Sequence, residues 1–217
     1  MFAHKETIGI FDIEEKAEGA LKHLIGGIMN KPIHKPDCEY SVEEARRVGE
    51  MLVGKAEFYD GLTEDWNEVE ANIRYFASKG VRIFFIDPLS ALVEHLSASD
   101  ANQELGKIMR SMRRFRQEQG LTFFSVNHLN NPPSGKDHGA GGTVYGSQFS
   151  GSRAQWKYST ALWGLSRDQL AEDEEERNQC KLTIIKDRLG GNTGSIDLYY
   201  DKNKGQLVES DMREGSF

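Results

Sequence analysis

The sequence predicts an α/β fold, in which a mostly parallel β-sheet is flanked by helices and followed by an antiparallel extension of that sheet. Three near-continuous apolar runs, at residues 7–13, 81–87 and 121–127, have the composition of strands buried on both faces. Amphipathic helical stretches separate them, which is the alternation that builds a parallel sheet. With 38% hydrophobic and 28% charged residues, the chain has enough apolar material for a core, and we expect one domain over residues 1–217.

Three helices are predicted between the first two apolar runs, over residues 15–30, 41–55 and 63–80. The first places its apolar side chains on one face and ends before Pro32. The second begins with a capping box, because Ser41 is followed three residues later by Glu44. The third begins at an N-cap signal and ends at Gly80.

The second half of the sequence adds a long helix and several short strands. The helix covers about residues 100–119 and leads directly into the third apolar run. Residues 129–152 are rich in Gly, Asn, Pro and Ser without periodicity, which is typical of a functional or disordered loop. The segments that predict the antiparallel extension lie at residues 158–165, 180–187, 195–201 and 206–208.

Composition and charge restrict the classes of function. The sequence has no run of eighteen apolar residues, so a membrane-spanning helix is excluded, and its first residues lack the apolar stretch of a signal peptide. Cys38 and Cys180 do not make a disulfide framework, and we expect a cytoplasmic protein. A zinc site on His34 and Cys38 would need two further ligands that the neighbouring sequence does not supply. The net charge of −7 argues mildly against nucleic-acid binding, although much of the excess lies in residues 166–178.

Polar residues follow each of the three apolar runs, where the carboxyl ends of parallel strands meet. Asp87 ends the second run; such a carboxylate can hold Mg²⁺, or it can be an ordinary N-cap or loop acid. Glu14 and Glu15 follow the first run; one of them can activate an attacking water, or both can complement a helix dipole. His128 follows the third run and can sense a γ-phosphate, or it can be a structural histidine.

Two cations precede a glycine-rich turn near the C-terminus. Lys186 and Arg188 are two residues apart on a predicted strand, so their side chains point to the same side. Directed at the nucleotide of a neighbouring subunit, Arg188 would neutralise charge on the transferred phosphoryl group. The alternative is a hairpin that carries two exposed bases.

Together and in this order, these features resemble the ring-forming, RecA-like replicative DNA helicases, above all the phage primase-helicases and the mitochondrial helicase Twinkle. The resemblance covers about residues 7–209, and its most specific segments read IFFIDPLSALV, FFSVNHLNNPPSGK, IIKDRLGGNTG and YYDKNKG. It implies a RecA-like P-loop NTPase core in a homo-hexameric ring. In that ring, hydrolysis of ATP or another nucleoside triphosphate with Mg²⁺ drives movement on single-stranded DNA, in the cytosol of a bacterium or a phage-infected host.

The same resemblance implies roles for individual residues. Those expected at the nucleotide are the catalytic glutamate Glu14 (with Glu15 second), the Walker B metal ligand Asp87, the phosphate sensor His128, the arginine finger Arg188 with its companion Lys186, and Arg167 and Tyr200 beside the base. Those expected to contact DNA lie in or after the loop at residues 129–152, and they are Asn130, Asn131, Lys136 and His138, with Arg153 and Lys157 as further candidates. One lysine in this loop is a weak electrostatic contact, but several subunits would present it together; the glycines of the loop can instead mean simple flexibility.

A phosphate-binding loop of the form Gly-x-x-x-x-Gly-Lys-Ser/Thr does not occur in the sequence. That loop supplies most of the triphosphate cradle, so we expect the chain alone to be inactive as an ATPase. Three explanations are open: a truncated product that lacks the Walker A strand and loop, one half of a split helicase whose other half is a separate polypeptide, or a ring subunit that donates Arg188 without hydrolysing ATP. The presence of Glu14, Asp87 and His128 favours the first two.

A non-hydrolysing, nucleic-acid-binding or ring-structural RecA-like subunit is the alternative function. The predicted long helix has a basic side with Lys107, Arg110 and Arg114 that could contact phosphate. The same helix has an apolar side with ordinary amphipathic spacing, which favours a solvated basic face.

Overall fold

The computed structural model of the protein describes residues 6–132, 135–149 and 151–210. The chain divides into two compact units, the first ending at His128 and the second beginning at Leu129. Each unit contains its own four-stranded sheet. That both units act as one motor domain, as the sequence suggests, stays a prediction.

The first unit is built on a parallel sheet with the strand order β2-β1-β3-β4. Its strands are β1 (Ile8–Asp12), β2 (Ala56–Tyr59), β3 (Ile83–Asp87) and β4 (Thr122–Ser125). All three pairings are parallel, and the register sets Asp12 of β1 directly beside Asp87 of β3. The predicted parallel sheet is therefore confirmed, and the acids that end β1 and β3 meet at its carboxyl edge.

The helical segments of this unit are α1 (Ala17–Met29), α2 (Val42–Leu52), α3 (Trp66–Ser78), the 3-10 helix η1 (Leu89–Val93) and α4 (Ala98–Gln119). The predicted cap of α2 is present, because Ser41 Oγ accepts a hydrogen bond from the backbone N–H of Glu44 at 3.2 Å. Ser97 caps α4 through the N–H of Asp100 at 3.3 Å, and Gly120 ends α4 in the left-handed region with φ 68°. In the part of the chain that the structure describes, no helix combines the length and hydrophobicity needed to cross a membrane.

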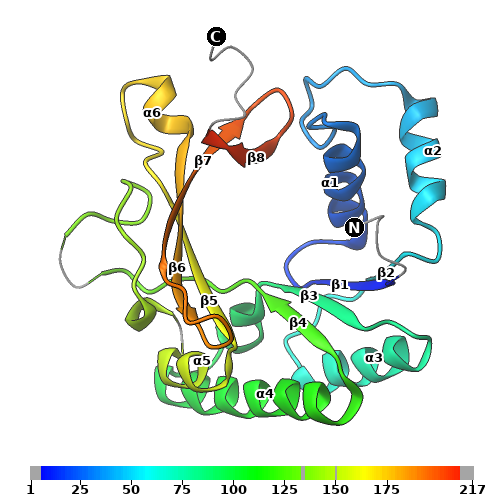
Figure 1. The fold of residues 1–217 in the computed structure, drawn as a ribbon. Coiled ribbons are helices and arrows are strands. Elements are labelled where there is room, and N and C mark those ends of the chain that lie inside the picture. Colours follow the sequence, from blue (N-terminus) through cyan, green and yellow to red (C-terminus); the bar gives the residue numbers. More distant parts are fainter. Residues whose placement is uncertain (1–5, 133–134, 150, 211–217) are drawn as a thin grey trace. The chain divides into compact units, whose positions relative to one another are not determined.

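One face of the parallel sheet packs against α3 and α4 (Figure 1). Phe11 on β1 and Phe84 on β3 are completely buried there. The ring of Phe11 lies 5.5 Å from the ring of Phe76 on α3, and the ring of Phe115 on α4 lies 6.2 Å from that of Phe123. Aromatic side chains bury more apolar surface than any others, so these contacts fix the sheet on its helical layer.

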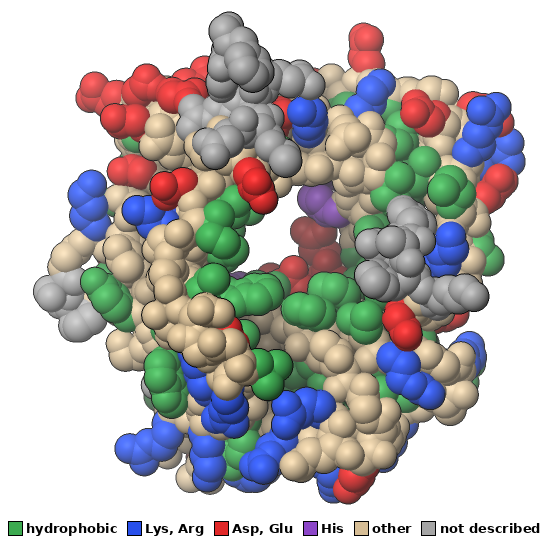
Figure 2. Space-filling view, in the orientation of Figure 1, with side chains coloured by type: hydrophobic (Ala, Val, Ile, Leu, Met, Phe, Trp, Pro, Cys, Tyr) green, Lys and Arg blue, Asp and Glu red, His purple; other side chains and the backbone are tan. Residues whose placement is uncertain are grey.

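The opposite face of the same sheet is only partly covered. Helix α1 lies on this side, with α2 packed against it (Figure 1), and their shared core consists of Ile25, Ile33, Val48 and Leu52. Over β3 and β4 the face stays open: Phe85 and Phe124 stack with their ring centroids 4.9 Å apart and are 39% and 41% exposed. Hydrophobic side chains are visible over these two strands in Figure 2. Parallel sheets are normally covered by helices on both faces, so the described residues leave this layer incomplete.

The second unit contains an antiparallel sheet in the order β5-β6-β7-β8. Its elements are η2 (Gly146–Gln148), α5 (Ser152–Tyr158), β5 (Ala161–Arg167), α6 (Glu174–Asn178), β6 (Gln179–Asp187), β7 (Gly194–Asp201) and β8 (Gln206–Glu209). These strands match the predicted C-terminal segments. They form a sheet of their own, however, and not an extension of the parallel sheet, because each described strand pairs with its neighbour along the chain.

One strand was absent from the sequence-based interpretation. The helix predicted over residues 41–55 ends at Leu52, and a turn through Gly54, with φ 72°, leads into β2. Strand β2 has four residues and lies at an edge of the sheet. A segment this short shows no hydrophobic period, so only its pairing with β1 defines it.

Candidate functional site

The carboxyl ends of β1 and β3 bring together a group of acids. The backbone N–H of Ile13 donates to the carbonyl oxygen of Asp87 at 2.8 Å, so the chain after β1 stays beside β3. Asp12 Oδ1 then accepts hydrogen bonds from the backbone N–H groups of Glu14, at 3.3 Å, and Glu15, at 2.9 Å. This turn holds both glutamates at the edge of the sheet, where the sequence predicts a catalytic carboxylate.

His128 lies at the same edge. Its backbone N–H donates to Ser90 Oγ at 3.0 Å, and its ring Nε2 lies 3.8 Å from Glu14 Oε1. The side chains of His128 and Glu14 are 53% and 48% exposed, so a ligand can reach both. The structure therefore brings together two predicted site residues that lie far apart in the sequence, one after the first apolar run and one after the third.

Electrostatic repulsion is strongest at Asp87. Its partial burial raises the pKa of the carboxyl group above the ordinary value, and the negative charges of Asp12, Glu14 and Glu15 raise it further; the ring of His128 acts in the opposite direction. Carboxylate oxygens are the ligands that Mg²⁺ prefers, and a divalent cation would relieve this repulsion. The residues present thus fit a bound Mg²⁺, with Asp87 as the expected ligand.

A cavity of about 1060 Å³ adjoins these acids. Its polar end is formed by Asp12, Glu14, Glu15 and Asp87, and its apolar floor by alternate residues of the open sheet face, among them Ile10, Phe85 and Phe124. Ala20, His23 and Leu24 of α1 form one wall. Cavities with an apolar lining and a few convergent polar groups are typical of ligand sites.

Two residues of this site were not identified from the sequence. Asp12 forms the turn that positions Glu14 and Glu15, and it resembles Asp87 in that it ends a buried strand, which is a signal that could have been used. Glu94 follows η1, and its Oε1 lies 2.7 Å from His128 Nδ1. Nothing in the sequence around Glu94 indicates this contact, because it depends on how η1 lies beside β4.

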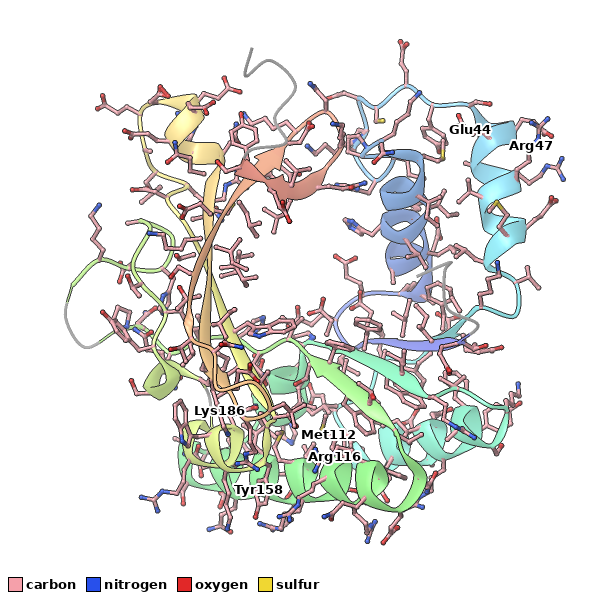
Figure 3. The ribbon with its side chains drawn as sticks, viewed as in Figure 1. Glu44, Arg47, Met112, Arg116, Tyr158 and Lys186 are labelled. Carbon is pink, nitrogen blue, oxygen red and sulfur yellow. The ribbon has the colours of Figure 1, made fainter. Side chains whose placement is uncertain are left out.

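In the second unit, Lys186 and Arg188 are held against the end of α5. Lys186 Nζ donates to the carbonyl oxygens of Trp156 and Ser159, the latter at 2.9 Å, and Figure 3 shows Lys186 beside α5. Burial, and secondarily the charge of Arg188, lower the pKa of Lys186. Arg188 is exposed, and its Nη2 donates to the carbonyl oxygen of Lys157 at 3.0 Å. The two predicted partners thus share one anchor, although Lys186 is turned inward and Arg188 outward.

Arg167 and Tyr200 meet within the antiparallel sheet. The guanidinium carbon of Arg167 lies 4.6 Å from the centroid of the Tyr200 ring, a cation–π contact. The same guanidinium donates to Asn178 Oδ1 at 2.9 Å and to the carbonyl oxygen of Arg177. The pair is therefore pre-arranged as a flat surface, and its contact with a nucleotide base stays a prediction.

The segment at residues 129–152 is better ordered than its composition predicts. Leu129 and Phe149 form a β-bridge, and the backbone N–H of Asn130 donates to the carbonyl oxygen of Gln148 at 2.7 Å. His138 Nε2 lies 3.2 Å from the carbonyl oxygen of Asn130, and its Nδ1 is buried with no partner among the described residues. Residues 133, 134 and 150 of this segment lie outside the described part of the chain.

The other predicted DNA contacts are exposed side chains. Lys136 Nζ lies 3.9 Å from Asp168 Oδ2, and its side chain is 74% exposed. Asn131 is exposed in the loop, and Arg153 and Lys157 are exposed on the short helix α5. These positions leave the side chains accessible, and their contact with DNA stays a prediction.

Comparisons with known proteins identify the fold. No family model matches the sequence, and no curated protein matches it. Among solved structures, the chain is similar to the ATPase domain of a helicase, with a TM-score of 0.68 and 19% identity over 94% of this chain and 74% of that one. It is also similar to "The Structure Of A DnaB-Like Replicative Helicase And Its Interactions With Primase", with a TM-score of 0.70 and 20% identity over 94% of this chain. The chain spans about half of that second protein, 51% of its length. The fold is therefore that of a RecA-like replicative-helicase ATPase domain.

Proposed function

We propose that this chain is the motor-domain part of a replicative DNA helicase that couples NTP hydrolysis at subunit interfaces to movement on single-stranded DNA. The observation that carries the proposal is the meeting of Glu14, Asp87 and His128 at the carboxyl edge of the parallel sheet. This edge is where open α/β sheets hold their ligands, and here it occurs on the fold of a replicative-helicase ATPase domain.

The three residues have complementary chemistry for phosphoryl transfer. Asp87 would hold Mg²⁺, which supplies positive charge to the phosphates of a bound nucleoside triphosphate. Glu14 would accept a proton from the attacking water. His128, whose Nε2 lies 3.8 Å from Glu14, would contact the γ-phosphate beside that water. The solvent accessibility of Glu14 and His128 supports these roles, because both must reach a ligand.

A phosphate-binding loop from another segment or a separate polypeptide would complete this site. The 217 residues contain no Gly-x-x-x-x-Gly-Lys-Ser/Thr sequence. The open apolar surface at Phe85 and Phe124, beside the acidic edge, supports this part of the proposal. A helix laid over that surface would complete the layer, and its N-terminus would be stabilised near the carboxylates by the helix dipole.

Assembly into a ring, with six subunits as the simplest arrangement, completes the proposal. Arg188 is exposed and donates one hydrogen bond to Lys157, while a guanidinium carries five N–H groups, so it retains donors for a neighbour's nucleotide. Asn130, Asn131 and Lys136 are exposed and would contact the DNA backbone. In this proposal the protein acts in the cytoplasm.

The alternative, a subunit that binds nucleic acid or supports a ring without hydrolysis, is favoured by the absence of the phosphate-binding sequence alone. It leaves the arrangement of Glu14, Asp87 and His128 without a chemical purpose. The same measurement of hydrolysis separates the two functions.

DNA-stimulated ATP hydrolysis tests the proposal. The chain is assayed alone and mixed with a polypeptide that carries a phosphate-binding loop, and we expect activity only in the mixture. In the mixture, Glu14→Gln should lower the rate about 10²–10⁴-fold, the usual contribution of a general base. Arg188→Ala should lower it by about 10³-fold or more, as expected for an arginine finger.

Matched variants control for general effects of charge. Glu18→Gln and Arg47→Ala change exposed side chains on α1 and α2 that lie in ion pairs with Lys22 and Glu43, and both should leave the rate unchanged. Activity in the chain alone would contradict the need for a second polypeptide. No activity in any mixture, together with retained binding of single-stranded DNA, would favour the alternative.

A further inference from the structure

Glu94 is placed where it can control the ring of His128. Its Oε1 lies 2.7 Å from His128 Nδ1, which is hydrogen-bond distance, while Nε2 on the other side of the ring lies 3.8 Å from Glu14 Oε1. A carboxylate can only accept a hydrogen bond, so this contact requires the proton on Nδ1. The opposite nitrogen is then directed at the catalytic side of the sheet edge.

The backbone of His128 is fixed from the same helical segment. Ser90, which is buried, accepts a hydrogen bond from the backbone N–H of His128 at 3.0 Å, and it precedes Glu94 by about one turn. The backbone N–H of Leu89 donates to the carbonyl oxygen of Val126 at 2.8 Å, so the start of η1 is also tied to the end of β4. Both the main chain and the ring of His128 are therefore held by one element.

A shared metal ion explains this geometry less well. Glu14, Glu94 and His128 offer ligand atoms within 4.8 Å of one another. However, the two carboxylates face opposite nitrogens of one imidazole, and a single ion cannot replace both of these contacts. The arrangement is that of a carboxylate orienting a histidine toward a third group.

We propose that Glu94 is a positioning residue, which holds the proton of His128 on Nδ1 and directs Nε2 toward Glu14 and the reacting phosphate. The inference rests on the proposed function for its catalytic consequence, although the positioning itself is a property of the first unit alone. Carboxylates that orient a histidine in this way fix both its tautomer and its ring angle.

Nitrogen-15 NMR of the histidine rings tests the positioning directly. Spectra of the chain, recorded with EDTA at about pH 8, where a free imidazole is neutral, should show His128 in the Nδ1–H form. Glu94→Ala should shift His128 toward the Nε2–H form, which free histidine prefers. Glu64→Ala is the matched control, because Glu64 Oε2 lies 3.3 Å from Nδ1 of another histidine, His95, and it should leave His128 unchanged. Thermal unfolding of each variant verifies that it is folded.

A kinetic measurement in the mixture separates the two hypotheses. Glu94→Ala should lower kcat by about 10-fold or more, as for other residues that orient a histidine, with little change in KM for ATP. It should have no further effect in a His128→Ala background. An unchanged ring spectrum in Glu94→Ala, or a wild-type spectrum that responds to EDTA, would overturn the positioning inference. The expected spectra together with an inactive mixture would instead contradict the proposed function.

Discussion

The ionisation of Asp87 links the candidate site to the stability of the first unit. Partial burial is the main reason that the pKa of Asp87 is raised, and the charges of Asp12 and Glu14 add to it. A carboxyl group with a higher pKa in the folded chain binds its proton more tightly there than in the unfolded chain. Its contribution to stability is therefore fully present below the unfolded-state pKa, and it is lost as the pH rises through the raised folded-state pKa.

Asp87→Asn should consequently stabilise the protein at neutral pH. The substitution removes a charge from a repulsive environment, so the free energy of unfolding should rise at about pH 7 and show no gain near about pH 3, where aspartate is protonated in either state. Urea titrations across this range measure the difference. Asp37→Asn, which changes an exposed acid after α1, should give no such pH-dependent gain. A less stable Asp87→Asn at neutral pH would show that its carboxylate makes a favourable contact.

Strand β3 shows how one element serves two different surfaces. Phe84 points into the core beside α3 and α4 and is fully buried, whereas Phe85 points to the open face and is 39% exposed. These neighbours have the same side chain and the same strand, so they provide a comparison in which only the environment differs. The comparison tests whether the open face is truly unfilled in the folded chain.

We expect Phe84→Ala to lower the free energy of unfolding by about 3–5 kcal/mol, the usual cost of removing a buried aromatic ring. Phe85→Ala should cost about 1 kcal/mol, because it loses mainly the stacking with Phe124. Urea unfolding of both variants measures these values. In the mixture with a loop-bearing polypeptide, Phe85→Ala should weaken association although the chain alone is nearly as stable as before. Equal costs for the two variants would mean that both faces are packed.

The elements that the sequence predicted well are those with a long local pattern. Strands β1, β3 and β4 are near-continuous apolar runs, and α2 carries its capping box in the sequence itself. Strand β2 could not be predicted, because its four residues take their meaning from pairing with β1. Glu14, Asp87 and His128 were accessible because parallel strands share one carboxyl edge. Glu94 was not, because its contact with His128 depends on the path of η1.

At the level of the whole molecule, charge is distributed unevenly. The net charge is −7, and the acids of α6, Glu174, Glu175 and Glu176, are among those that gather in Figure 2. Lys and Arg side chains gather along α4 in the same view. A DNA footprint depends on local clusters of base and not on the average, so an acidic chain can still bind a phosphate backbone. The decisive quantity is then how binding depends on salt.

Lys136 is the predicted DNA contact for which the salt dependence gives the clearest test. Its Nζ lies 3.9 Å from Asp168, an exposed pairing that contributes about 0–1 kcal/mol and leaves the lysine available. If Lys136 contacts one phosphate, Lys136→Ala should reduce the slope of log Kobs against log salt by about 0.7, the value for single strands. Fluorescence anisotropy of labelled single-stranded DNA in the active mixture measures this slope.

Lys181 provides the matched control for this measurement. It is another exposed lysine of the second unit, on β6, and its Nζ lies 4.0 Å from Asp197 in an equally weak pairing. Lys181→Ala removes the same charge from the same unit but from outside the predicted loop. If both substitutions reduce the slope equally, DNA responds to the total charge of the unit and the loop has no special role. A reduction with Lys136→Ala alone would assign the contact to the segment at residues 129–152, as a channel loop requires.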